Sequence, residues 1–343
     1  MTALVQKLAP VRTRISLTAA LVMVLAALLT LPLGGAIAEP GDDEGGTASL
    51  RAKLDKANSD YNNAKGKLDA SRKQQKAFDA EIKKLQDTAN GLSGKVGALA
   101  AAVYKGNRAD TISVILESGS PEELAHGMTT VEYLAHRDYQ QIKTLSKTRD
   151  QLAKKRYQVE LELRKQRAAL KTMEKRKKDA LNALIAAGGG DPTGGPDGGA
   201  PSAEPAPRNP DGSWPSESCS ENDPTTDGCL TPRTLHALQE AREAGYNRHT
   251  ACFRNASYGE HGKGRACDMA AFKDGFRNQA AYGADKQYGD NLAGFFVSNA
   301  DRLGVMYVIW YRRIWQPGSG WTSYSGSGGP SSEHTNHVHV SIQ

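Results

Sequence analysis

The run Thr335-Asn-His-Val-His-Val-Ser-Ile342 decides the fold of the C-terminal part of the chain, because its polar and apolar residues alternate. Such alternation is typical of a β-strand with one face in the core. Side chains two residues apart point to the same face of a strand, so His337, His339 and Ser341 would share the face opposite the core. This spacing places two imidazoles side by side, which makes the strand a candidate for a metal or catalytic site.

A second segment, Glu260-His-Gly-Lys-Gly-Arg-Ala-Cys-Asp268, can supply the remaining ligands of such a site. Its two glycines allow a tight turn between His261 and Asp268. Catalytic zinc usually takes three protein ligands, and His261, Asp268 and His339 could be those three. His337 would then lie beside the metal without binding it. The alternative interpretation is a set of scattered surface histidines and an ordinary loop aspartate.

The two segments together resemble the zinc metallopeptidases related to lysostaphin, to D-Ala-D-Ala carboxypeptidases and to the hedgehog signalling domain. The carboxypeptidase branch carries a Ser-x-His-x2-Gly-x-Ala-x-Asp motif. His261, Gly264, Ala266 and Asp268 fall in register with that motif, whereas Gly259 stands where the family has Ser. The resemblance covers the C-terminal domain only, and it implies that the cofactor is Zn²⁺.

The resemblance also implies roles for two further residues. A Gly-Tyr-Arg sequence in the family is similar to Cys252-Phe-Arg254, which implies that Arg254 grips a substrate carboxylate; a structural salt bridge is the alternative. The family's Glu-x-x-His base is absent, because Asn336 lies three residues before His339. The His-x-His variant of the superfamily is therefore the better template, and it points to His337 as general base or oxyanion stabiliser.

All four cysteines, Cys219, Cys229, Cys252 and Cys267, fall in the C-terminal domain. An even number of cysteines in an exported domain suggests two disulfides. Cys219 with Cys229 would close a short loop, and Cys252 with Cys267 would tie together the two segments near the candidate site, although the sequence permits three pairings. Thiolate zinc ligands are the alternative, but no Cys-x2-Cys pair is present.

Residues 1–38 have the pattern of a signal peptide. Three basic residues precede a long apolar stretch over 15–33, and Ala36-Ile-Ala38 has the small-x-small form of a cleavage site. This pattern predicts a protein that is secreted or cell-wall associated after cleavage. An uncleaved membrane anchor is the alternative, because the apolar stretch approaches spanning length.

Residues 46–187 are predicted to form a long helical hairpin. Apolar residues recur in steps of four and three from Leu50 to Val103, and again from Ile142 to Leu184, which is a heptad seam. The stretches between them break the pattern, so the two helices would pair antiparallel; a parallel dimer is the alternative. In architecture, and in the stretch Ala102-Val-Tyr-Lys-Gly106, the hairpin is similar to the coiled coils of exported bacterial cell-wall hydrolases and their activators.

The predicted fold class is multidomain: a long antiparallel α-helical coiled-coil hairpin plus a small α+β domain with an antiparallel sheet. Residues 188–215 are rich in glycine and proline and are predicted to be a flexible linker. Residues 216–343 would form the zinc peptidase-like α+β domain.

Local signals predict the elements of this domain. Thr231 as N-cap, Pro232 at the first position and Gly245 as the stop indicate one helix, and a second is expected over 290–303. Residues 305–315 are expected to form a buried strand. Three tryptophans, Trp310, Trp315 and Trp321, could line a substrate groove, although core packing is the default expectation for the first two.

The chain has a formal net charge of +6, and basic residues are dense over Lys171–Lys178. Basic patches can bind nucleic acid, but an exported protein meets little of it, so no nucleic-acid partner is expected. The expected partners are peptidoglycan or another anionic cell-wall polymer and, through the coiled coil, a membrane-associated protein. A solvated coiled-coil exterior is the alternative for most of these charges.

Two functions agree with these observations. The first is a zinc-dependent peptidase that acts on peptidoglycan stem peptides or cross-bridges, like a D,D-carboxypeptidase or endopeptidase. The second is a non-catalytic cell-wall-binding scaffold or hydrolase activator with a relic zinc domain. The complete ligand set favours the first, whereas Gly259 and the missing glutamate leave room for the second.

Overall fold

A computed structural model of the chain describes residues 47–106, 113, 115, 117, 119–197, 199–256 and 259–343. The predicted signal peptide, residues 1–38, lies outside the described residues, as does much of the predicted hairpin tip. Among the described helices, none combines the length and the apolar character that crossing a membrane requires.

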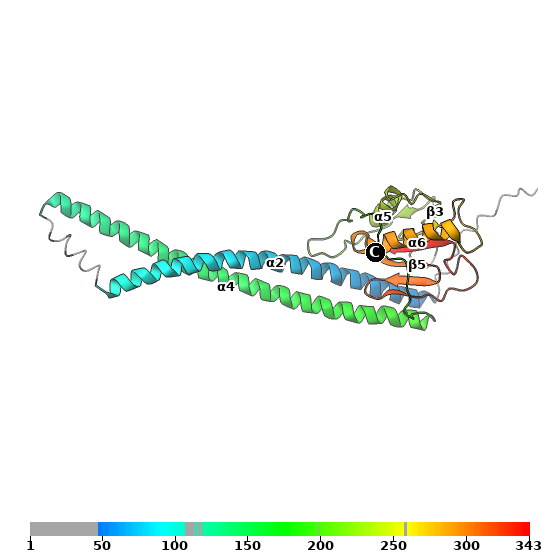
Figure 1. The fold of residues 1–343 in the computed structure, drawn as a ribbon, viewed down its shortest axis with the longest axis horizontal. Coiled ribbons are helices and arrows are strands. Elements are labelled where there is room, and N and C mark those ends of the chain that lie inside the picture. Colours follow the sequence, from blue (N-terminus) through cyan, green and yellow to red (C-terminus); the bar gives the residue numbers. More distant parts are fainter. Residues whose placement is uncertain are drawn as a thin grey trace, which may run out of the picture. The chain divides into compact units, whose positions relative to one another are not determined.

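Two long helices confirm the predicted antiparallel hairpin. Helix α2 spans Ala48–Tyr104, helix α4 spans Pro121–Ala186, and the two run side by side in opposite directions (Figure 1). Each begins at a hydroxyl N-cap: Thr47 Oγ1 accepts from the backbone N–H of Leu50, and Ser120 Oγ accepts from that of Glu123. These caps satisfy backbone donors that have no partner inside the helix.

Polar side chains contribute to the contact between the two helices. Ser71 Oγ donates to Glu162 Oε2 at 2.8 Å, and both side chains are buried. One helical turn further on, Gln166 Nε2 donates to Gln75 Oε1 at 2.8 Å. Buried polar groups need partners, so these pairs favour one register of the two helices over its neighbours.

The C-terminal domain contains the antiparallel six-stranded sheet that positions the candidate site. The strand order is β3-β4-β8-β5-β6-β7. The strands span Thr250–Ala251 (β3), Ala266–Ala270 (β4), Val305–Trp310 (β5), Arg313–Gln316 (β6), Gly320–Ser323 (β7) and His337–Ile342 (β8). Around the sheet lie the helices α5 (Pro232–Glu243), α6 (Gly283–Ser298) and α7 (Ala300–Leu303) and a two-stranded ribbon of β1 (Glu221–Asn222) and β2 (Cys229–Leu230). The predicted α+β class is confirmed.

Two elements differ from the sequence prediction. Where one helix was expected over 290–303, α6 ends at Ser298 and α7 follows over Ala300–Leu303. Helix α6 also begins at Gly283 rather than at 290, because its first two turns carry mostly polar side chains and lack an apolar pattern. The strand expected over 305–315 is two strands, β5 and β6. They meet at Tyr311 and Arg312, whose φ values are 54° and 62°. Tight hairpin turns with two positive φ values usually use Asn or Gly, so Tyr311 and Arg312 carry no turn signal.

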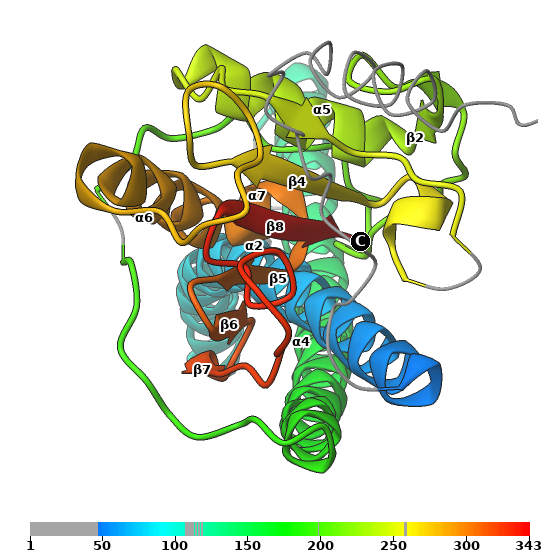
Figure 2. The same ribbon diagram turned by 90° about the vertical axis from the view of Figure 1, so that its right-hand side faces the viewer.

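One face of the sheet packs on α5 and α6 and forms the main core. Val338, Val340 and Ile342 lie in this core, as their alternation predicts, together with Leu238 of α5 and Leu292 of α6. Figure 2 shows β8 between β4 and β5, with these helices beside them. The three tryptophans considered for a substrate groove pack in or against this core instead: Trp310, Trp315 and Trp321.

The segment 188–215 differs from the flexible linker that its composition predicts. Gly190 N donates to Ser323 O and Thr193 N donates to Trp321 O, so the segment follows the edge strand β7. Ala203 is buried in the main core and Trp214 is buried as well. A few small and aromatic side chains are sufficient to dock this glycine- and proline-rich segment.

The four cysteines form two disulfides, Cys219–Cys229 and Cys252–Cys267, and no cysteine of the described residues is free. The second bond joins the residue that follows β3 to the middle of β4, the strand that carries Asp268. Disulfides of this kind are typical of proteins that function in an oxidising, extracytoplasmic environment.

Candidate metal centre

Three neighbouring elements bring the predicted ligands together. His261 begins η1, a single 3-10 turn over His261–Lys263, and Asp268 lies in the middle of β4. Asp268 is paired directly with His339 of β8, and Ala270 is paired with His337. Cross-strand partners in an antiparallel sheet share a face. Asp268, His337 and His339 are therefore neighbours on the face that points away from the main core.

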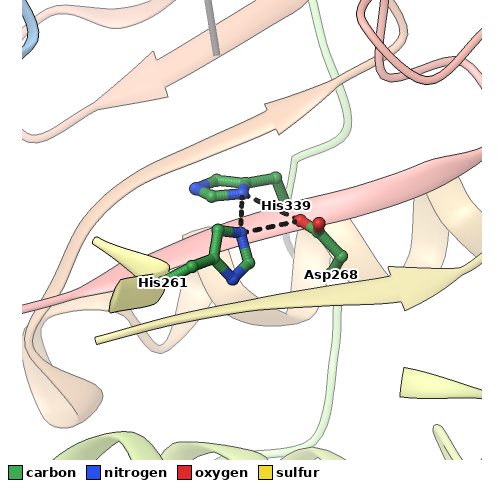
Figure 3. A group of neighbouring side chains, drawn as sticks. All are labelled: His261, Asp268 and His339. Atoms are coloured by element: carbon green, nitrogen blue, oxygen red, sulfur yellow. Dashed lines mark hydrogen bonds and ion pairs between the residues drawn. The ribbon is translucent and has the colours of Figure 1, made fainter. Parts of the chain in front are cut away.

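The side-chain atoms of His261, Asp268 and His339 converge on one point (Figure 3). His261 Nε2 lies 3.2 Å from His339 Nδ1 and 3.3 Å from Asp268 Oδ1. His339 Nδ1 lies 2.9 Å from the same oxygen. The three atoms form a nearly equilateral triangle of two imidazole nitrogens and one carboxylate oxygen.

This triangle fits a zinc ion. Ligand atoms that share a tetrahedral zinc at bond lengths of about 2.0–2.2 Å lie roughly 3.3–3.6 Å from one another. The observed separations of 2.9–3.3 Å are only slightly shorter. Two imidazoles and one carboxylate are also a donor set that catalytic zinc uses.

Hydrogen bonds to the outer ring nitrogens orient both histidines. His261 Nδ1 lies 2.5 Å from the carbonyl oxygen of Cys252, which can only accept, so Nδ1 carries the proton and Nε2 presents a lone pair to the site. His339 Nε2 lies 2.8 Å from Ser341 Oγ, which can accept a proton from it and leave the lone pair on Nδ1. Metal-binding histidines are commonly oriented through the second ring nitrogen in this way.

Arg254 pairs with the carboxylate oxygen that points away from the triangle. Its Nη1 lies 2.6 Å from Asp268 Oδ2, and both side chains are largely buried. Burial alone would raise the pKa of Asp268, but the nearby imidazoles, when they are protonated, and the Arg254 guanidinium outweigh burial and hold that pKa well below its usual range. The carboxylate is therefore ionised. Arg254 forms the salt bridge that was the alternative interpretation, and its contact with a substrate carboxylate remains a prediction.

His337 lies beside the triangle with one ring nitrogen fixed. Asn336 Nδ2 donates to Arg277 O at 2.7 Å, which turns Asn336 Oδ1 toward His337 Nδ1, 2.7 Å away. Because an amide oxygen can only accept, His337 Nδ1 carries the proton and Nε2 is the basic nitrogen. His337 Nε2 is buried, has no hydrogen-bond partner and lies 3.4 Å from Asp268 Oδ1. Burial lowers the pKa of His337, so the ring is held neutral.

The turn before β4 depends on glycine at two positions. Gly259 has φ of 85°, where a side chain would be strained. Gly264 has φ of 66°, and a Cβ there would lie 2.3 Å from Cys219 Sγ. Between them Glu260 is fully buried and pairs with Lys263 and Arg265.

Some residues of the site were not anticipated from the sequence. The ring of Tyr307 stacks on that of His339 at a centroid distance of 5.6 Å, and the ring of His334 lies 4.7 Å from that of His337. Tyr307 could have been found, because it is in phase with Ile309 on a predicted strand. His334 lies in a turn at φ of 50°, and no periodic signal marks it. Burial and its histidine neighbours hold the pKa of His334 well below its usual range.

The candidate ligands are closed off from solvent. His261 is 2% exposed, Asp268 1% and His339 0%. Catalysis on a polymer requires access to such a group, so what covers this site decides what the protein can do.

Comparison with known proteins gives one family match. A family model described as VldE, C-terminal domain, matches residues 226–335. The matched segment contains His261 and Asp268 and ends before His337 and His339. No curated protein and no solved structure matches the chain. The C-terminal domain is thus similar to the VldE C-terminal domain, and the match covers less than half of the chain.

Proposed function

We propose that this chain is an exported zinc-dependent peptidase that cuts peptidoglycan stem peptides or cross-bridges. The observation that carries the proposal is the triangle of His261 Nε2, Asp268 Oδ1 and His339 Nδ1, because its dimensions and donor types suit zinc. The choice of peptidoglycan rests on the resemblance to lysostaphin-like and carboxypeptidase zinc enzymes. A signal peptide at residues 1–38 would deliver the enzyme to the wall.

The residues of the site have separate roles in this proposal. His261, Asp268 and His339 would hold the zinc, and when bound the metal supplies Lewis acidity toward a carbonyl oxygen and toward water. His337 would accept a proton at Nε2, since Nδ1 is held protonated by Asn336. Arg254 keeps Asp268 ionised and oriented, which favours a cation at the other carboxylate oxygen.

A non-catalytic role is the second candidate, and the burial of the site favours it. In a scaffold or activator of a cell-wall hydrolase, the zinc would stabilise the domain and the hairpin would bind a membrane-associated partner. The predicted peptidoglycan contact would then be one of binding without cleavage. The two candidates differ in whether any wall peptide is released.

The test combines metal analysis with a peptidoglycan digest on the full chain. We expect the purified protein to contain one zinc by elemental analysis. His261→Ala, Asp268→Ala and His339→Ala should each lose it, because each removes one of three ligands. His337→Ala should keep zinc and lose most turnover, measured as stem-peptide fragments by mass spectrometry. Absence of zinc in the wild type would refute the proposal, and a zinc-loaded protein that releases nothing from varied peptidoglycans would favour the second candidate.

A further inference from the structure

An apolar strip continues the face of the sheet that carries the candidate metal site. Ile309 of β5 is paired directly with His339, and Ile314 of β6 is paired with Ile309. Cross-strand partners share a face, so this strip begins beside a predicted zinc ligand. Tyr307, stacked on the His339 ring, belongs to the same face.

The base of the hairpin buries this strip. Apolar side chains of the hairpin and of the sheet domain form one cluster that is separate from the main core. Its members are Leu54, Ala57, Ala180, Ala183 and Leu184 from the hairpin and Met306, Tyr307, Ile309, Ile314 and Tyr324 from the sheet domain. At one side of the cluster Asn62 Nδ2 donates to the carbonyl oxygen of Val305 at 2.9 Å. The first turns of α2 and the last turns of α4 therefore cover the face next to His339.

The space left between the hairpin and the strip is too small for a substrate. The cavity lined by Leu54, Leu184, Tyr307 and Ile314 has a volume of about 30 Å³. Such a volume holds one or two water molecules, whereas binding sites for small ligands measure about 300–1,000 Å³. A peptide and the hairpin base cannot occupy the strip at the same time.

The hairpin contributes two leucines and three alanines to this cluster. Polar contacts extend this interface along α2: Asn63 Oδ1 accepts from Trp214 N, and Lys65 pairs with Asp301. Interfaces between parts of one chain generally resemble transient interfaces more than obligate ones. The contact can therefore open while the main core, which lies on the opposite face of the sheet, stays packed.

We propose that the strip of Tyr307, Ile309, Ile314 and Tyr324 is the floor of a peptide-binding groove, and that the base of the hairpin is its built-in occupant. This inference rests on the proposed peptidase function for its choice of ligand. Alanine methyl groups and methylene groups of a wall peptide would contact the strip in place of Leu54 and Leu184, which brings the peptide backbone to the edge of the His261–Asp268–His339 triangle. The chain is closed until the hairpin base leaves the strip.

The test places a charge on the hairpin side of the cluster in the full chain. Leu54→Glu and Ala183→Glu should separate the hairpin from the strip, since burying a carboxylate among these apolar side chains is costly. Leu152→Glu is the matched control, because Leu152 is as buried as Leu54 but lies outside the cluster. Circular dichroism checks that the helices persist in each variant.

Three measurements report whether the hairpin base has left the strip. Hydroxyl-radical footprinting should oxidise Tyr307 and Tyr324 several-fold faster in the two cluster variants, while Trp310 in the main core stays protected. Binding of a synthetic peptidoglycan stem pentapeptide, measured by calorimetry, should tighten at least tenfold. Release of wall peptides should rise by a similar factor. The Leu152→Glu protein should match wild type in all three.

The outcomes separate this inference from the proposed function. Tighter pentapeptide binding without cleavage in any variant would support the groove and refute the peptidase. Exposed tyrosines with pentapeptide binding and turnover equal to wild type would overturn the groove. Protected tyrosines in folded Leu54→Glu and Ala183→Glu proteins would overturn the release of the hairpin.

Discussion

At the scale of single residues, hydrogen bonds fix where each proton of the site lies. Cys252 O orients His261, Ser341 Oγ orients His339 and Asn336 Oδ1 orients His337. Two of these three partners are carbonyl oxygens, which cannot donate. The unprotonated Nε2 atoms of His261 and His337 therefore lie on the side of Asp268, where a cation could bind between them and the carboxylate.

Ser341 supports His339, and its removal should weaken zinc binding. For Ser341→Ala we expect the dissociation constant for zinc to rise roughly 10–100-fold, because partners of this kind hold a metal ligand in its orientation. Competition with a chromogenic chelator measures it. Ser298→Ala, at an exposed position on α6, is the control and should bind like wild type. Equal zinc affinity in both variants would show that Ser341 does not support His339.

The metal-free domain should lose stability as the pH falls. Burial lowers the pKa of His334 and of His337, so in acid the unfolded chain binds protons that the folded chain does not. Stability is then complete above the ordinary histidine pKa of 6.5 and is lost as the pH decreases below it. The lowered pKa of Asp268 adds a further loss below 3.8.

Urea unfolding of the chelator-treated protein measures this dependence. The midpoint should fall between about pH 7 and about pH 5. In His334→Gln the fall should be smaller, whereas His126→Gln, at an exposed hairpin position, should leave it unchanged. A midpoint that rises on acidification would contradict the assignment of neutral buried histidines.

At the scale of elements, the turn from η1 to β4 sets the distance between two ligands. Gly264 ends η1 in the left-handed region, beside Cys219 and Cys229 of the first disulfide. The turn that leads into β4 is thus packed against the Cys219–Cys229 disulfide. A change at this turn would move His261 relative to Asp268.

Gly264→Ala should destabilise the domain more than Gly320→Ala does. Both positions have similar positive φ values, 66° and 72°, but a Cβ at Gly264 meets Cys219 Sγ and Cys229 O, whereas at Gly320 it meets nothing within 4 Å. Backbone strain costs about 1–3 kcal/mol at each position, and the clash adds to it only at Gly264. Thermal unfolding compares the two. Equal losses would mean that the turn can shift to accommodate the Cβ.

The elements differ in how far the sequence predicts them. The helices α2 and α4, the caps of α5 and the strand β8 follow from periodicity and capping residues, and they are confirmed. The turn at Tyr311 and Arg312 does not, because its residues are chosen by tertiary contacts: Tyr311 N donates to His334 O, and Arg312 pairs with Glu333. The proximity of His261, Asp268 and His339 was predictable because histidine and aspartate at these spacings are uncommon outside functional sites; their binding of zinc stays a prediction. The packing of the hairpin base on the sheet was not predictable, since apolar residues carry no sign of their partner.

At the scale of the whole molecule, parts distant in sequence complete one another. The segment 188–215 adds Ala203 to the main core and places Trp214 against Arg208 and Arg233, with ring-to-guanidinium distances of 3.6 and 4.6 Å. The sequence predicts that the C-terminal domain begins at residue 216. In the structure, residues before 216, such as Ala203 and Trp214, also pack into this domain.

A fragment that starts at 216 should therefore be less stable than one that starts at 188. We expect the melting temperature of residues 216–343 to be lower than that of residues 188–343 by roughly 10 °C, since loss of a buried tryptophan alone costs about 3 kcal/mol. Trp214→Ala in the longer fragment should account for much of the difference. Equal melting temperatures of the two fragments would show that the segment docks without stabilising.

The place of β8 in the sheet has a consequence for biogenesis. It follows every other strand in the chain, yet it lies between β4 and β5. During synthesis from the N-terminus, β3 with β4 and β5 with β6 and β7 can form as two separate ribbons, and only the arrival of β8 joins them. The same strand brings His337 and His339. The three candidate ligands therefore come together only at the last step of chain assembly, when β8 closes the sheet.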